Sequence, residues 1–154
     1  MRAIYEKTLG IEHPWFATTL HALASVYSDT GHYAEAEKLY EQVRAIYEKT
    51  LGTEHPALAT TLKNLAFVCC DTGRFARARD LVEQAHRIYA ATLSPRHPRM
   101  ARLLIARATV REGFACLDEA RADLREAIAM LDEAGVLAGE RWAREARKRL
   151  SRLP

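Results

Sequence analysis

Apolar residues follow a helical period along most of this chain. Four of them, spaced i, i+3, i+4 and i+7, are Leu20, Leu23, Ala24 and Tyr27. Side chains with this spacing share one face of an α-helix. The same stripe returns 42 residues later as Leu62, Leu65, Ala66 and Cys69. No stretch alternates apolar and polar residues as a strand would, so the pattern predicts an all-α protein.

Prolines and glycines divide the helical stretches at regular points. Proline suits the first turn of a helix, because its missing N–H has no partner to lose there. Glycine adopts the left-handed conformation that ends many helices. The breaks are the His-Pro pairs at 13–14, 55–56 and 97–98, together with Gly31 and Gly73. They predict a hairpin in each unit, with helix A over about 14–29 and helix B over about 32–51.

The sequence also repeats itself directly. Residues 2–10 (RAIYEKTLG) recur unchanged as residues 44–52, and the units 2–43 and 44–85 agree at 27 of 42 positions. A third unit, 86–127, keeps only the skeleton of this pattern. A period of this length is typical of stacked helical repeats, in which each unit buries its apolar face against its neighbours.

The hairpin pattern resembles the tetratricopeptide repeat. The residues that carry the resemblance are Leu20-x2-Leu23-Ala24-x2-Tyr27 and Gly31-x-Tyr33-x2-Ala36-x3-Tyr40. A unit of about 42 residues that ends in Leu-Gly-x-Glu-His-Pro is similar to the kinesin light chain type of this repeat, since the usual unit is about 34 residues long. The resemblance implies a right-handed α-solenoid, closed here by a C-terminal capping helix. We expect a single domain divided into residues 1–12 (the tail of a partial repeat), 13–54, 55–96, 97–134 and the capping helix 136–153.

The N-terminal edge departs from the repeat. Residues 1–12 match the end of a helix B whose own helix A is missing. Either the chain is a fragment of a longer array, or another chain covers the apolar residues Ile4 and Leu9. Self-association through these residues is therefore one alternative function.

The third unit is irregular in its helix A. Arg107 and Arg111 stand where the second unit has Leu65 and Cys69. A charged residue at a packed position requires a partner. We therefore expect this helix to be rotated or to face solvent, with Leu103, Ala106, Val110 and Phe114 as its apolar stripe.

The resemblance also implies where a ligand would bind. In such arrays the exposed face of helix A lines a concave groove, and a basic residue and an asparagine there often hold a peptide. The positions assigned to this groove are His21, Ser25, Thr60, Lys63, Asn64, Phe67 and Arg102. We expect a protein or peptide partner with acidic groups, because the charged residues of this set are basic; a solvated face without a ligand is the alternative.

Composition excludes several other classes. The net charge of +3 over 154 residues is too small to indicate nucleic acid by itself, although the arginines of 96–111 and 141–152 leave a regulatory role in a larger signalling or nucleic-acid-linked protein as a further alternative. No apolar run approaches the roughly 18 to 20 residues of a membrane span, so no membrane partner is expected. No catalytic, metal or cofactor motif is present, which predicts neither an enzyme nor a cofactor. Three cysteines without disulfide or metal spacing favour the cytoplasm.

Overall fold

The fold is a row of α-helices, seen in a computed structural model that describes residues 13–135 and 140–154. All regular elements in these residues are helices. They are α2 (Pro14–Asp29), α3 (Tyr33–Thr50), α4 (Pro56–Asp71), α5 (Phe75–Thr92), α6 (Pro98–Gly113), α7 (Leu117–Glu133) and α8 (Arg141–Arg152). Ile4 and Leu9, the residues predicted for self-association, lie outside the described residues.

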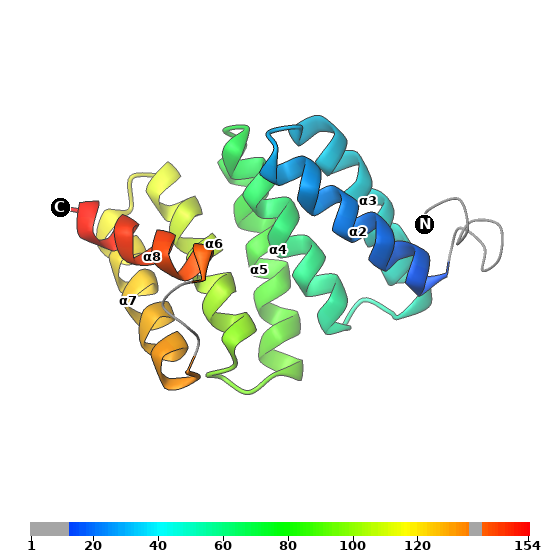
Figure 1. The fold of residues 1–154 in the computed structure, drawn as a ribbon. Helices are drawn as coiled ribbons and strands as arrows, with labels where there is room; N and C mark the ends of the chain where they lie inside the picture. Colours follow the sequence, from blue (N-terminus) through cyan, green and yellow to red (C-terminus); the bar gives the residue numbers. More distant parts are fainter. Residues whose placement is uncertain (1–12, 136–139) are drawn as a thin grey trace.

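The helices form three antiparallel hairpins stacked side by side, α2/α3, α4/α5 and α6/α7, with α8 against the last of them (Figure 1). Small side chains at the hairpin contacts allow this close packing. Ala24 and Ala36 in the first hairpin and Ala66 and Ala78 in the second have no exposed surface. The apolar stripes predicted from the sequence thus meet in one continuous core.

The three His-Pro pairs begin the three A helices in the same way. The histidine side chain of each pair accepts a hydrogen bond from the backbone N–H two residues further on. The proline follows in the first turn of the helix. This bond satisfies one of the backbone donors that a helix N-terminus leaves unpaired. His13, His55 and His97 are therefore N-caps.

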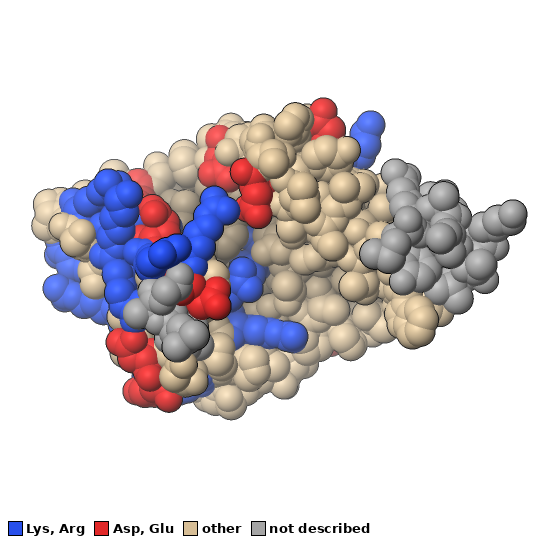
Figure 2. All heavy atoms as spheres, viewed as in Figure 1, with Lys and Arg blue, Asp and Glu red and all other residues tan. Residues whose placement is uncertain are grey.

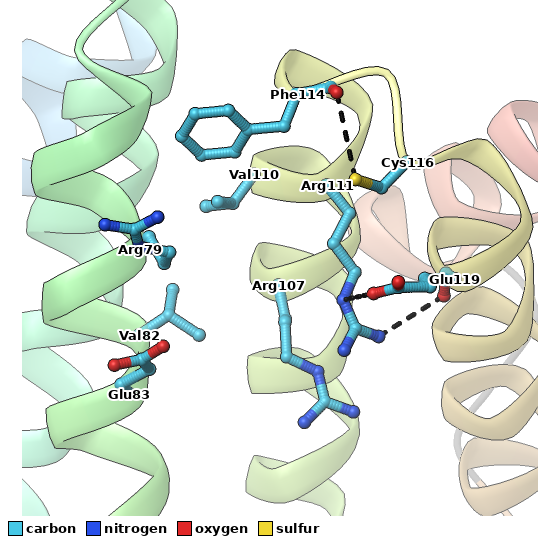
Figure 3. Close-up of a pocket in the computed structure, with 9 residues that line it drawn as sticks. All are labelled: Arg79, Val82, Glu83, Arg107, Val110, Arg111, Phe114, Cys116 and Glu119. Atoms are coloured by element: carbon cyan, nitrogen blue, oxygen red, sulfur yellow. Dashed lines mark hydrogen bonds and ion pairs between the residues drawn. The ribbon is translucent and has the colours of Figure 1, made fainter.

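The expectation of a rotated or solvent-facing α6 is wrong. Ala101 and Ala108 are fully buried, like Ala59 and Ala66 at the equivalent positions of α4, so α6 keeps the same orientation. The two arginines are tolerated because each has a charged partner on α7. Figure 3 shows Arg107 and Arg111 on α6, which stands between α5 and α7.

That partner is Asp123, whose side chain is only 3% exposed. Arg107 binds it through two hydrogen bonds of 2.6 and 3.1 Å. Arg111 donates a third bond of 2.6 Å to the same carboxylate. Asp123 stands 42 residues after Leu81, so three apolar positions of the second repeat have become charged together in the third.

The C-terminal helix α8 covers the open end of the stack, at the left in Figure 1. Ala146 is fully buried, and Trp142, Leu150 and Leu153 pack against the core. Arg149 on α8 donates hydrogen bonds to Glu112 at 2.6 Å and to Thr109 at 2.8 Å, both on α6. Of the capping segment predicted over 136–153, residues 136–139 lie outside the described residues.

In one turn an alanine adopts a backbone conformation that is unfavourable for residues with a Cβ atom. Ala115 has φ +59° where the first two repeats have Gly31 and Gly73 with φ +82° and +77°. A left-handed conformation costs a residue with a Cβ atom roughly 1 to 2 kcal/mol. Glycine removes this strain but makes the unfolded chain more flexible, which offsets about 0.4 to 1 kcal/mol of the gain. We expect Ala115→Gly to raise the free energy of unfolding by about 0.5 to 1 kcal/mol, measured by urea denaturation.

The reverse change supplies the control for this turn. Gly73→Ala introduces the same strain at the equivalent position of the second repeat, where a Cβ atom would meet nothing within 4 Å. It should lower stability by a similar amount. Equal stabilities for wild type and Ala115→Gly would show that the turn at Ala115 is unstrained.

Candidate groove on the A helices

Two adjoining hollows lie along the A helices. The first, of about 450 Å³, is lined by Ser25, Ser28, Asp29, Tyr33, Tyr40, Asn64, Phe67, Asp71, Arg102 and Arg141. The second, of about 360 Å³, is lined by Thr18, His21, Tyr47, His55, Pro56, Ala57, Thr60 and Arg99. Six of the seven residues predicted for the groove line one of these hollows. The seventh, Lys63, lies on the same helix as Thr60 and Asn64.

The groove hydroxyls are already used within the hairpins. Ser25 lies 2.9 Å from the hydroxyl of Tyr40, and Thr60 lies 2.6 Å from the hydroxyl of Tyr89. Both tyrosines are buried and come from the B helix of the same hairpin. Ser25 and Thr60 therefore satisfy buried phenol groups, and this interaction fixes helix A to helix B beneath the groove.

Asn64 joins the first two repeats across the groove. Its side-chain nitrogen lies 3.1 Å from Nε2 of His21 on α2. Burial, with added repulsion from Lys63 and Arg102, lowers the pKa of His21 from 6.5 to about 4. His21 is thus neutral at pH 7, and its Nε2 can accept the amide proton of Asn64. The His21 ring also meets the ring of Tyr40 edge to face, with centroids 5.3 Å apart.

Lys63 differs most from its sequence-based assignment. The groove prediction placed it on an exposed face, yet its side chain is only 2% exposed. α6 packs alongside α4, and Arg99 and Arg102 of α6 lie close enough to repel Lys63. No described residue forms an ion pair or hydrogen bond with Lys63. Burial, followed by repulsion from Arg102 and Arg99, lowers the pKa of its ammonium group to about 7.

Positive charge collects at the C-terminal half of the groove. Figure 2 shows blue side chains gathered over the α6 to α8 end of this face, whereas the part over α2 and α4 is mostly uncharged. The guanidinium group of Arg102 lies over the ring of Trp142, 5.0 Å from its centroid, and this contact holds it in place. Asp29 and Asp71 line the same hollow, and Arg141 lies 3.7 Å from Asp29.

Two contributors to this site were absent from the sequence prediction. Arg99 lines the second hollow beside Thr60, and Trp142 orients Arg102 from α8. Arg99 precedes Arg102 by one helical turn, so the helical period could have indicated it. Trp142 could not be found in this way, because the contact depends on how α8 packs.

Antiparallel helix hairpins stacked in register, with a shared core and a groove along the A helices, define an α-helical repeat solenoid. The family model of the tetratricopeptide repeat matches residues 2–49, 16–91 and 57–133. The chain belongs to the tetratricopeptide repeat family. Its repeats are of the kinesin light chain-like type, as the structural comparisons below indicate.

Several solved structures share this fold. A Podosopora anserina protein described as having kinesin light chain nearly identical TPR-like repeats is 32% identical, with a TM-score of 0.71 over 98% of this chain and 71% of that one. A variant of that protein is 31% identical, with a TM-score of 0.72 over the same shares. BtubC (BKLC) from P. vanneervenii, at 18% identity and a TM-score of 0.70 over 91% of this chain and 64% of that one, shares the fold. The comparison with curated proteins gives no match.

The fold sets the general function. Tetratricopeptide repeats generally mediate protein–protein interaction and are typically non-enzymatic. Within residues 13–135 and 140–154, no helix has both the length and the apolar character needed to cross a membrane.

Proposed function

We propose that this chain is a non-enzymatic interaction module that binds an acidic peptide segment in the groove along α2, α4 and α6. The observation that carries the proposal is Lys63, which is buried and has no counter-ion among the described residues. Such a group either loses its proton, as its pKa of about 7 allows, or is stabilised in its charged form by a ligand that supplies the missing charge. The proposal also places the protein in the cytoplasm, where the buried thiols Cys69 and Cys70 would stay reduced.

The surroundings of Lys63 favour a carboxylate over other groups. Burial is the main cause of the lowered pKa of Lys63, and repulsion from Arg102 and Arg99 adds to it, so the three cations form one positive region. A carboxylate bound there would offset all three charges at once. Phe67, half-buried in the neighbouring hollow, offers an apolar contact for the same segment. The acidic residues Asp29 and Asp71 line that hollow too, which favours placing the carboxylate toward Arg99.

A peptide array tests the proposal. Acidic peptides that bind the wild-type chain are resynthesised with every Asp and Glu replaced by Asn and Gln, and affinities are measured by fluorescence anisotropy. We expect the amide versions to bind at least tenfold more weakly. Arg102→Glu should weaken the acidic peptides by a similar factor, because it reverses a charge at the groove.

Arg125→Glu is the matched control for that charge reversal. Arg125 is exposed on α7 and lines neither hollow of the groove. Arg125→Glu changes the net charge by the same amount as Arg102→Glu. The comparison therefore separates binding at the groove from long-range electrostatic attraction, which salt would screen. Equal losses for Arg102→Glu and Arg125→Glu, or undiminished binding of the amide peptides, would refute the groove.

A further inference from the structure

The ion pairs between neighbouring B helices differ at the two junctions of the array, α3/α5 and α5/α7. Between α3 and α5, Glu37 accepts hydrogen bonds of 2.6 and 2.9 Å from Arg74. Arg77 pairs with both Glu37 and Glu41. The positions 42 residues further on are Arg79, Glu83, Cys116 and Glu119. In the part of the chain that the structure describes, no ion pair joins α5 to α7, so this second junction lacks the network of the first.

A cavity of about 420 Å³ opens at the second junction. We call it the outer cleft; it is lined by Arg79, Val82, Glu83, Arg107, Val110, Arg111, Phe114, Cys116 and Glu119 (Figure 3). Its volume falls within the roughly 300 to 1,000 Å³ of typical ligand sites. The figure shows α5 as one wall and α6 as the other, with Cys116 and Glu119 at the start of α7.

Phe114 forms the upper rim of the outer cleft. It stands where the second repeat has the smaller Thr72, and its side chain points toward α5 (Figure 3). The ring lies 6.3 Å from the ring of Phe75, centroid to centroid, and remains 44% exposed. The guanidinium group of Arg79 lies 5.6 Å from the centroid of the same ring. With Val82 and Val110 below, Phe114 offers an apolar slot bordered by charge.

The cations around this slot exceed the carboxylates. Arg107 is held by Asp123 through its Nε and Nη2 atoms, and its Nη1 has no hydrogen bond to a described residue. The adjoining hollow along α5, which also contains Arg107, adds His86 and Arg87 to the lining. Four arginines therefore border these two hollows. Their lining contains the carboxylates of Glu83 and Glu119, and Asp123 neutralises part of the charge of Arg107 and Arg111 from α7, so the arginines exceed the carboxylates by one. This charge balance suits an acidic ligand.

We propose that the outer cleft is a second binding site, which receives a large apolar side chain of a partner protein segment and pairs an adjacent carboxylate with Arg79 and Arg107. Aromatic side chains that fill such pockets supply much of the binding energy at protein interfaces. Arg107 is fixed by Asp123 before the ligand arrives, so little of its freedom is lost on binding. The site uses other residues of α6 than the groove does, and it does not depend on the proposed function.

Three synthetic peptides probe the site: acetyl-Glu-Trp-Glu amide, its Gln-Trp-Gln counterpart and Glu-Ala-Glu. Binding is followed by NMR of the methyl groups of Val82 and Val110, which lie in the cleft and not in the groove. We expect saturable shifts with Glu-Trp-Glu, and at least fivefold weaker binding of the other two peptides. Phe114→Thr and Arg79→Glu should each weaken Glu-Trp-Glu at least fivefold. Arg125→Glu and Lys148→Met, at exposed positions outside the cleft and the groove, should leave its affinity within twofold of wild type.

The outcomes separate the two sites. Arg79 is 55% exposed, so Arg79→Glu tests the cleft even where Phe114→Thr fails to fold. Absence of saturable shifts at millimolar peptide overturns the proposal. So does binding of the uncharged or alanine peptide with affinity equal to that of Glu-Trp-Glu. Failure of the groove experiments has no bearing on these shifts.

Discussion

Asp123→Ala is expected to lower the free energy of unfolding by about 3 kcal/mol, the scale found when one partner of a buried ion pair is removed. Asp123 is 3% exposed, and it accepts bonds from both Arg107 and Arg111, which are only 30% and 29% exposed. Without the carboxylate, two guanidinium groups remain close together at the α6/α7 contact without their shared counter-charge. Urea denaturation followed by circular dichroism measures the loss.

A triple variant gives the matched control. Arg107→Leu, Arg111→Cys and Asp123→Leu together restore the residues of the second repeat, where Leu65, Cys69 and Leu81 are almost completely buried. Replacing a buried ion cluster with packed apolar residues is often neutral or stabilising by about 1 to 4 kcal/mol. We therefore expect the triple variant to be at least as stable as wild type. A loss below about 1 kcal/mol for Asp123→Ala would contradict the prediction, because it would mean that the cluster is effectively solvated.

Repeat arrays do not always unfold in a single step. The denaturation should thus be followed at two places. Trp142 lies on α8 against Arg102 of α6, so in a Trp15→Phe background its fluorescence reports the C-terminal end, whereas circular dichroism reports all helices. Coincident transitions would justify a single free energy; separate ones would assign the loss to the α6–α8 end.

Local signals in the sequence are sufficient to predict where the helices begin and end. The predicted span of the first helix A, 14–29, agrees with α2, because a capping histidine with proline fixes its start and a turn glycine fixes its end. Interactions between the side chains of different helices are harder to predict. The pattern of α6 taken alone predicts a rotated helix, because the residue that pairs with its arginines, Asp123 in place of Leu81, lies on α7. The repeat alignment contained that information, since it places all three changed positions together.

The burial of Lys63 could not be predicted in the same way. Helical periodicity assigns a side chain to one face of its own helix, and for Lys63 it predicts the face that forms the groove wall. Whether the next A helix covers that face depends on how α4 and α6 pack. The equivalent position is half-buried in the first repeat, at His21, and covered in the next two, at Lys63 and Ile105. Only the packed structure distinguishes these cases.

Lys63→Met is expected to stabilise the fold by about 3 to 5 kcal/mol below pH 7. Burial lowers the pKa of Lys63 from 10.5 to about 7, and each pKa unit corresponds to about 1.4 kcal/mol. Below pH 7 the folded protein carries this unfavourable buried charge. Methionine has a similar shape and no charge, so it removes the penalty without leaving a cavity. The free energy of unfolding in urea at pH 6 measures the gain.

The sign of the pH dependence follows from proton linkage. Between pH 7 and 10.5 the unfolded chain binds more protons at Lys63 than the folded chain does, so the stability of the wild type rises with pH. The advantage of Lys63→Met should therefore shrink steadily from pH 7 to pH 9.5. His21, with its pKa near 4, does not titrate in this range. Lys148→Met, at an exposed position on α8, provides a control whose stability difference should not change with pH.

Lys63→Met should also weaken the binding of the proposed acidic peptide at least tenfold, although it stabilises the protein. A bound carboxylate favours the charged form of Lys63, so binding above pH 7 requires the uptake of a proton, and affinity should fall as the pH rises. Calorimetry at pH 8 in buffers of different ionisation enthalpy would detect that proton for the wild type and not for Lys63→Met. Stabilisation without any loss of affinity would make Lys63 a structural residue, and it would leave Arg99 and Arg102 as the cations of the groove. A loss of both together would mean that methionine disturbs the packing of α4 against α6.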